Sequence, residues 1–186
     1  MTSAASPQSS SRSPSPVPSA PATDVESMYR AELKPVWRFV CRLGIPAPEV
    51  EDLVHEVFLT AFKKWPDYDR TRPARPWLFG IAYRIVADYR RLKRHGAEIS
   101  GDDLPEQSVQ PPPVLERRDA NRVLDYALSR MSEAARTVFV MHELEERPVP
   151  EIAELMETPV PTAYTRLRAA RQIFAETVAK LNEASP

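Results

Sequence analysis

The chain of 186 residues contains few cysteines, glycines and histidines, and each shortage excludes a class of protein. A single cysteine, Cys41, cannot form a disulfide framework, and its neighbours predict a small core residue on a helix. Four glycines provide no phosphate-binding loop. The three histidines complete no metal site, because Asp52–His55 and His142–Glu146 are only fragments of metal-binding motifs. We therefore expect no metal and no cofactor.

Long hydrophobic runs are missing as well. No apolar segment is long enough to cross a bilayer, and the N-terminal residues lack the apolar core of a signal peptide. These absences predict a cytoplasmic protein without membrane insertion.

The net charge is only −1, but charge is strongly segregated along the chain. Residues 63–94 carry ten Lys or Arg against three Asp, a net of +7, whereas residues 96–157 carry a net of −8. A local basic segment of this kind can bind nucleic acid even when the whole chain is nearly neutral. The overall pI is therefore no guide to nucleic-acid binding.

The apolar pattern is helical wherever it is periodic, and no segment predicts a strand. Residues 1–24 are rich in Ser and Pro and almost lack large apolar side chains, which predicts a disordered tail. Residues 25–95 and 118–183 are expected to be helical domains. Residues 96–117, acidic and rich in proline, have the composition of a flexible linker. We expect an all-α chain with two small domains.

The helix expected over residues 48–65 has a carboxylate stripe beside its apolar stripe. Its apolar side chains recur at steps of three and four for about four turns. Glu49, Asp52 and Glu56 share a second stripe. Carboxylates directly before a basic segment suit a protein that lies between a basic protein partner and a nucleic acid.

The basic segment of residues 70–94 also contains aromatic side chains. Trp77, Phe79, Tyr83 and Tyr89 alternate with arginines, a composition used where unstacked bases meet aromatic rings. The alternative is that these rings fill the core and the arginines form a solvated face. The inward stripe of this helix is expected to comprise Leu78, Ile81, Ala82, Ile85, Tyr89 and Leu92.

The C-terminal third predicts a helix-turn-helix. Ser132 is a suitable N-cap for an earlier helix, and a short helix from Pro150 precedes a tight turn and a long final helix. The second helix of such a pair can enter a major groove. The inward positions are Val160, Ala163, Leu167, Ala170 and Phe174, which leaves Thr162, Thr165, Arg166, Arg168 and Arg171 for phosphates and base edges. The alternative is an ordinary helical hairpin with a solvated basic face.

Together these segments resemble the extracytoplasmic-function group of bacterial sigma factors. EDLVHEVFLTAF is similar to the family's polymerase-docking helix, with His55 in place of the usual Gln. PARPWLFGIAYRIVADYRR resembles the segment that recognises and melts the minus-ten element. The residues from LSRMSEAARTVFV to RAARQIF resemble the domain that binds the minus-thirty-five element, except that Glu157 replaces the usual turn glycine.

The resemblance implies a sigma factor that binds core RNA polymerase and directs promoter-specific initiation, with residues 25–95 as the region-two domain and 118–183 as the region-four domain. It implies polymerase contacts at Asp52, Leu53, Glu56, Val57 and Phe58. It implies minus-ten contacts at Arg75, Trp77, Arg84, Arg90, Arg91 and Arg94. The implied minus-thirty-five contacts are Thr162, Thr165, Arg166, Arg168 and Arg171.

Two other functions remain as alternatives. A free-standing helix-turn-helix repressor would bind DNA without polymerase, although it would have no need of the carboxylate stripe. A sigma-like interaction module would sequester another partner. An anti-sigma factor is a common partner in the family, and nothing in the sequence identifies one. In each case the chain performs no bond chemistry, so we expect that it is not an enzyme.

Overall fold

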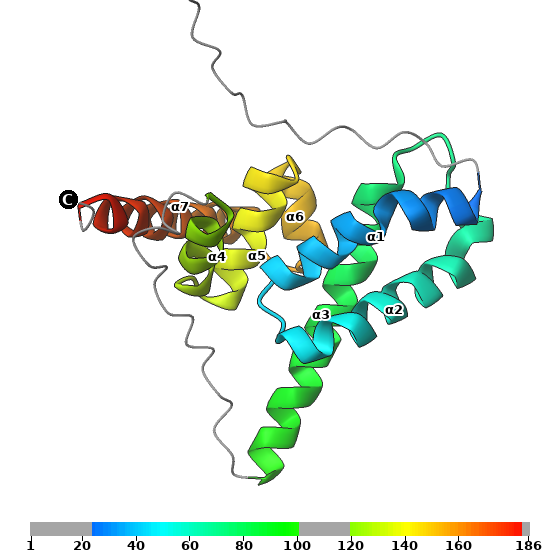
Figure 1. Ribbon diagram of the computed structural model, residues 1–186, viewed down its shortest axis with the longest axis horizontal. Helices are drawn as coiled ribbons and strands as arrows, with labels where there is room; N and C mark the ends of the chain where they lie inside the picture. The colour runs from blue at the N-terminus through cyan, green and yellow to red at the C-terminus, as the bar shows by residue number, and fades with distance from the viewer. Residues whose placement is uncertain (1–23, 101–119, 184–186) are drawn as a thin grey trace, which may run out of the picture.

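The computed structural model describes residues 24–100 and 120–183 (Figure 1). All regular structure in these two segments is helical, which confirms the expected all-α fold. Residues 1–23 of the predicted tail and residues 101–117 of the predicted linker lie outside the described residues. No helix among the described residues is long and apolar enough to cross a membrane.

The first helical unit contains α1 (Val25–Arg42), α2 (Ala47–Lys64), a short 3-10 turn η1 (Trp65–Asp67) and α3 (Ala74–Ser100). The helix α1 begins at Asp24, whose side chain accepts a hydrogen bond from the Ser27 backbone N–H at 2.8 Å. It ends before Gly44, which has the left-handed φ of 86°. The three long helices pack around a shared core in which the Phe39 and Phe79 rings stack at 4.2 Å.

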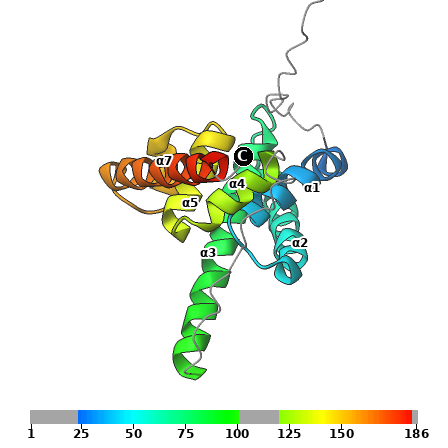
Figure 2. The same ribbon diagram turned by 60° about the vertical axis from the view of Figure 1, so that its left-hand side comes forward.

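The helix α3 runs to Ser100 and passes Gly96, where the linker was expected to begin. One glycine in a helix costs only about 1 kcal/mol relative to alanine. The Ala97-Glu98-Ile99 sequence that follows contains good helix formers, which offset this cost. Figures 1 and 2 show that the C-terminal half of α3 projects beyond the other helices. Leu92, expected to face inward, is 68% exposed on this projecting part.

The second unit contains α4 (Ala120–Ser129), α5 (Glu133–Phe139), a π-helical turn η3 (Val140–Leu144), α6 (Val149–Leu155) and α7 (Val160–Glu183). Ser132 is the N-cap of α5, as predicted, and its hydroxyl accepts from the Ala135 backbone N–H at 3.4 Å. The long α7 packs against α4, α5 and α6 (Figure 1). Helices α6 and α7 form the predicted helix-turn-helix.

The buried apolar side chains of both units join one connected cluster. Cys41 is not part of it, so the prediction of a core cysteine was wrong. The residue lies on the exposed side of α1, between the buried Val40 and Leu43. Partial burial and the charge of Asp125 in α4 raise the pKa of its thiol. The thiolate is therefore a minor form at neutral pH.

Candidate polymerase and nucleic-acid interfaces

The predicted polymerase-docking residues on α2 divide into exposed carboxylates and buried apolar side chains. Asp52 and Glu56 are exposed on the outer face of the helix. Leu53, Val57 and Phe58 are buried and fill the core of the first unit. These three residues position α2, and Phe58 also lines the groove described below; their predicted contact with polymerase stays a prediction. In an amphipathic helix the apolar stripe faces the core and the polar stripe beside it faces solvent, so one motif contains residues of both kinds.

The third member of the carboxylate stripe, Glu49, faces α3. Its side chain pairs with Lys93 at 3.2 Å. Lys93 lies over the Tyr89 ring at 5.4 Å from the centroid, and hydrogen bonding to Glu49 raises the pKa of its ammonium group. Glu49 therefore joins α2 to α3 and leaves Asp52 and Glu56 as the outward carboxylates of this stripe.

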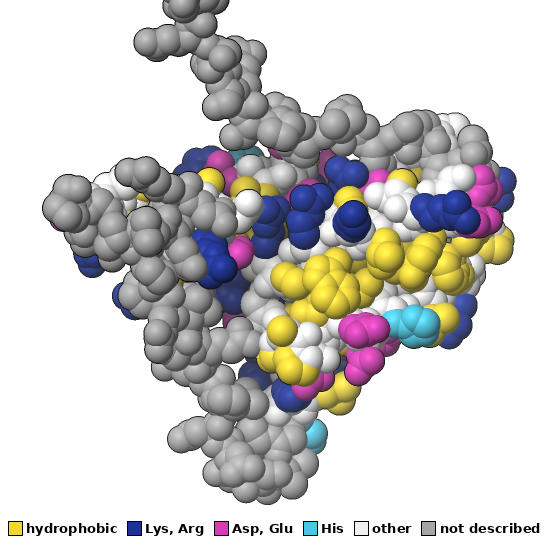
Figure 3. Space-filling model, in the orientation of Figure 1, with side chains coloured by type: hydrophobic (Ala, Val, Ile, Leu, Met, Phe, Trp, Pro, Cys, Tyr) yellow, Lys and Arg dark blue, Asp and Glu magenta, His cyan; other side chains and the backbone are white. Residues whose placement is uncertain are grey.

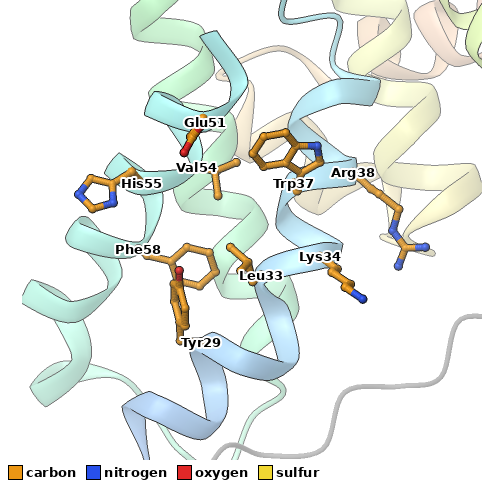
Figure 4. A pocket seen from close by; sticks show the side chains of 9 residues that line it. All are labelled: Tyr29, Leu33, Lys34, Trp37, Arg38, Glu51, Val54, His55 and Phe58. Carbon is orange, nitrogen blue, oxygen red and sulfur yellow. The ribbon is translucent and has the colours of Figure 1, made fainter. Parts of the chain in front are cut away.

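An apolar groove of about 560 Å³ lies between α1 and α2 (Figure 4). It is lined by Tyr29, Leu33, Lys34, Trp37, Arg38, Glu51, Val54, His55 and Phe58. The Tyr29 and Phe58 rings meet edge to face at 4.8 Å. Figure 3 shows a band of apolar surface with cations along α1 on one side and acidic and histidine side chains of α2 on the other. An exposed apolar band with charged rims is typical of a protein-binding surface.

The loop between α2 and α3 is organised by aromatic packing. Tyr68 stacks on Trp65 at 5.2 Å and on Trp77 at 4.4 Å, and its hydroxyl donates to the Arg72 carbonyl. Trp65 and Tyr68 are buried, and Trp77 is half-buried. Trp77, predicted to contact the minus-ten strand, lies at the end of the cluster and keeps part of its surface exposed to solvent.

A carboxylate fixes the polar part of this loop. Asp69 accepts hydrogen bonds from the Thr71 backbone N–H at 3.0 Å and from the Thr71 hydroxyl at 2.6 Å. These bonds lower the pKa of the Asp69 carboxyl. Arg70 lies over the Trp65 ring at 5.5 Å. These contacts hold the loop against its aromatic cluster, and the loop cations Arg70 and Arg72 are exposed.

Arg75, predicted to bind DNA, has a structural partner instead. Its guanidinium spans the Glu32 carboxylate, with Nε–Oε2 at 2.8 Å and Nη2–Oε1 at 3.4 Å. The Glu32 side chain is only 3% exposed. A paired arginine of this kind satisfies a buried charge and ties α1 to α3. Arg75 therefore has a structural role in the free chain, and its predicted contact with DNA stays a prediction.

The remaining cations of α3 fall into two groups. Arg84 and Arg91 are exposed, and Arg91 pairs only locally with Asp88 at 3.0 Å. Arg90 and Arg94 both contact Glu133 of α5, in the second unit. Among the aromatic residues that alternate with arginines in this segment, Phe79 is a core residue. Tyr83 and Tyr89 are half-buried beside the cations.

The predicted minus-thirty-five residues lie at the N-terminal half of α7. Thr165 and Arg168 are exposed, whereas Thr162 and Arg166 are half-buried. Arg171 is exposed and pairs with Glu143 of η3 at 2.6 Å. The inward set is confirmed at its buried members Ala163, Leu167 and Ala170, and at Phe174, which packs 5.3 Å from Phe139. Val160 is exposed, because it begins the helix beside the turn.

One residue that sequence reasoning missed belongs to the same face. Tyr164 is 54% exposed and stands one residue before Thr165 and four before Arg168. Residues four apart are neighbours on a helix surface. The sequence did contain a signal, because Tyr164 is an aromatic residue at a position outside the inward stripe of α7.

The turn between α6 and α7 contains a non-glycine residue in the left-handed region. Glu157 has φ of 48°, and the Thr158 N–H bonds to the Ala153 carbonyl at 2.9 Å, the pattern of a Schellman C-cap. For a residue with a Cβ, this left-handed conformation lowers the stability of the protein by about 1–2 kcal/mol.

We expect Glu157→Gly to stabilise the protein. Relief of the left-handed strain, less the added freedom of the unfolded chain, leaves a gain of about 0.5–1 kcal/mol. The melting temperature should rise by about 1–4 °C in a thermal denaturation measurement. Glu154→Gly, inside α6, is the matched control and should lower it. An equal loss in both variants would contradict the assignment of strain.

The side chain of Glu145 is expected to titrate near neutral pH. Burial raises the pKa of Glu145 to about 7, and Glu32 of α1 adds to this rise. The cations that oppose the shift are Arg42, Arg75 and Arg38, from α1 and α3. The folded protein therefore holds a proton between about pH 4.5 and 7 that the unfolded chain has released.

Stability should consequently fall as the pH rises through this window and level off above about pH 7. The loss attributable to Glu145 is at most about 3 kcal/mol. We expect Glu145→Gln to remove most of this pH dependence when the free energy of unfolding in urea is compared at pH 5.5 and pH 8. The same pH dependence in the variant and the native chain would show that Glu145 does not titrate in this way.

Comparisons with known proteins agree with this architecture. A family model described as sigma-70 region 2 matches residues 28–95, and one described as sigma-70, region 4 matches residues 121–173. The RNA polymerase sigma factor CnrH of Cupriavidus metallidurans is 30% identical over 138 residues, covering 69% of this chain and 72% of that protein. The ECF RNA polymerase sigma factor SigW of Bacillus subtilis is 24% identical over 160 residues, covering 80% and 84%.

Two solved structures share the fold. The sigma factor RpoE from Bartonella quintana, in complex with the anti-sigma factor NepR, has a TM-score of 0.66 at 17% identity and covers 85% of this chain and 98% of its own. CnrH, in complex with the cytosolic domain of CnrY, has a TM-score of 0.57 at 21% identity, with 84% and 88% covered.

The chain therefore belongs to the sigma-70 family of RNA polymerase sigma factors, in its extracytoplasmic-function group. As a sigma factor it is a transcription initiation factor whose partners are core RNA polymerase and promoter DNA.

Proposed function

We propose that the chain directs core polymerase to promoters by three surfaces. Asp52 and Glu56 dock on a basic surface of the polymerase. The loop between α2 and α3, together with α3, recognises and melts the minus-ten element. The helix α7 binds the minus-thirty-five element. The observation that carries this proposal is the separation of exposed carboxylates on α2 from exposed arginines on α3 and α7. The domain limits at residues 25–95 and 118–183 remain part of the proposal.

The melting of the minus-ten element follows from the charges and rings at the start of α3. Unstacking costs a few kcal/mol per base step, which a small basic face cannot supply alone. Docking on polymerase makes the DNA contact effectively intramolecular. Trp77 at the end of its aromatic cluster then offers a surface for a flipped base, while Arg84 and Arg91 follow strand phosphates.

Since the chain supplies binding rather than bond chemistry, it acts as a subunit of polymerase and not as an enzyme of its own. We place it in the cytoplasm, where polymerase transcribes the chromosome. An anti-sigma factor is a further proposed partner, because the solved RpoE structure contains one and the CnrH structure likewise contains a bound protein, the cytosolic domain of CnrY. The apolar groove between α1 and α2 offers a protein-binding surface of the required kind.

Reconstitution tests the function directly. Core polymerase with the chain should initiate at discrete sites on genomic fragments, and core alone should not. The start sites would also reveal the two promoter elements. Absence of specific initiation at any fragment would overturn the proposal, and tight specific binding to DNA without polymerase would favour a free-standing repressor.

We expect Tyr164→Ala to weaken binding of the minus-thirty-five element by about tenfold, since one base contact is worth about 1–3 kcal/mol. Because the side chain is 54% exposed, the stability of the protein should stay within about 0.5 kcal/mol. Footprinting of the holoenzyme on the duplex element measures the effect. Gln172→Ala, exposed two turns further along α7, is the control. Equal footprints for both variants would exclude a base contact by Tyr164.

A further inference from the structure

The groove between α1 and α2 lies within a larger exposed apolar face. Trp37 of α1 is 39% exposed, and Tyr29, near the start of the same helix, is 38% exposed. Phe62 of α2 is 38% exposed, and its ring lies 6.2 Å from the Tyr29 ring. Figure 3 shows a continuous band of apolar surface over these two helices. A band of this kind is typical of a surface that binds another protein.

The two edges of this face carry opposite charges. Lys34 and Arg38 are exposed on the α1 side, whereas Glu51 and Asp52 are exposed on α2. Arg38 and Glu51 lie at the same end of the groove, on either side of Trp37 (Figure 4). Within the described part of the chain, neither Lys34 nor Glu51 forms an ion pair. A matching partner therefore needs an acidic edge opposite α1 and a basic edge opposite α2.

A second copy of the chain presents both edges. A twofold axis that runs along the groove turns one copy over onto the other and places α1 of each against α2 of its partner. Because Arg38 and Glu51 lie at the same end of the groove, Arg38 of one copy then faces Glu51 of the second copy, and the symmetry repeats the pair. A twofold axis across the groove would instead place α1 against α1 and oppose like charges. The charge pattern therefore selects the first arrangement.

The size of the face sets the expected strength of the contact. Each of the two helices has 18 residues and is therefore about 27 Å long, and two helices side by side are about 20 Å wide. The resulting footprint of about 500 Å² is smaller than the roughly 800 Å² per partner that a stable complex buries. We expect a dissociation constant of about 1–100 µM, so that the two copies separate readily.

We propose that this face forms a reversible homodimer, in which the exposed aromatic side chains of two copies pack together and Arg38 pairs with Glu51 of the second copy. The dimer also covers Asp52, which stands beside Glu51. Its formation therefore competes with docking on polymerase, a consequence that rests on the proposed function. Above the dissociation constant, the monomer concentration rises only with the square root of the total concentration. The dimer thus limits the amount of chain that can reach polymerase.

Sedimentation velocity of the full native chain measures self-association directly. We expect the weight-average mass to rise from that of a monomer toward that of a dimer between about 1 and 300 µM. A reducing agent is present throughout, because Cys41 is exposed and its oxidation would link two copies by a disulfide. A native chain that remains monomeric at the highest concentration overturns the proposal and leaves the face to a different protein.

A charge swap distinguishes this dimer from any other. Arg38→Glu opposes like charges in the homodimer, and so does Glu51→Arg, so each variant should associate about tenfold more weakly than the native chain. An equimolar mixture of the two variants restores both opposite-charge pairs and should dimerise with about native affinity. Recovery also shows that both variants are folded. Lys180→Glu and Glu176→Arg, on exposed sites of α7, are the matched controls and should associate as the native chain does.

Native self-association of Arg38→Glu would overturn the pairing. So would the absence of recovery in a mixture of two variants that both have the circular dichroism of the native chain. Trp37→Ala is a test that does not depend on charge, and it should weaken self-association by at least about tenfold. Unchanged self-association of this variant would contradict the packing of the aromatic side chains.

The dimer and the proposed function fail by different results. Self-association is measured without polymerase, so a native chain that dimerises but supports no specific initiation loses the promoter role and keeps the dimer. A native chain that initiates with core polymerase but stays monomeric keeps the promoter role and loses the dimer.

Discussion

The double variant Asp52→Lys, Glu56→Lys should lose binding to core polymerase by at least about 100-fold. Both carboxylates are exposed on α2, and the neighbouring Leu53 and Val57 are buried, so the charges are what this face offers to a basic partner. Placing like charges opposite each other in an interface costs several kcal/mol. Fluorescence anisotropy of the labelled chain, titrated with core polymerase, measures the affinity.

A second pair of carboxylates provides the control. Glu176 and Glu183 are exposed on α7, and their reversal to lysine makes the same change in net charge. This control should bind core polymerase as the native chain does. Native affinity in the α2 variant, or an equal loss in the control, would exclude docking through Asp52 and Glu56.

The largest effect on stability is expected from Arg75→Met. The substitution leaves the Glu32 carboxylate, which is 3% exposed, without its bidentate partner. Removal of one member of a buried ion pair typically costs about 3–5 kcal/mol. Thermal denaturation should show a fall in melting temperature of about 10 °C.

The double variant Glu32→Leu, Arg75→Met separates a structural role from a DNA-binding role. Replacement of both partners by apolar groups is often close to neutral for stability. We expect the double variant to recover most of the lost stability and to support transcription with core polymerase. A stable double variant that fails specifically at promoter melting would show that Arg75 also contacts DNA.

Local physical rules predicted the helices well. The three- and four-residue periodicity indicated α1, α2, α3 and the helix-turn-helix, and the cap at Ser132 followed from its side-chain chemistry alone. Such features depend on neighbours within one or two turns. The errors at element ends have a local cause too, since Gly96 was treated as a stop and is only a weak one.

The exposed or buried state of single residues was harder to predict. The docking motif mixes outward carboxylates with inward apolar positions, and a motif alone does not separate them. Leu92 fits the inward stripe of α3, yet the bundle ends before the helix does. Cys41 has buried neighbours on α1 but lies between them on the outer face.

Partners far apart in the chain could not be predicted at all. Glu32 and Arg75 are 43 residues apart, and Glu133 reaches Arg94 across 39 residues that include the predicted linker. No periodic pattern connects such positions. The structure therefore supplied two contacts that bear directly on the site: Arg75 forms an ion pair with the buried Glu32, and Arg90 and Arg94 both contact Glu133.

The extension of α3 to Ser100 also affects how far the two helical units can move apart when each is bound to its proposed promoter element. A residue advances the chain by about 1.5 Å in a helix and by about 3.3 Å when extended. Each residue that unwinds after Gly96 thus lengthens the connection by about 2 Å, and residues 96–100 together by about 9 Å. Under the promoter role proposed above, we expect the end of α3 to act as an adjustable spacer worth two to three base pairs, about 3.4 Å each.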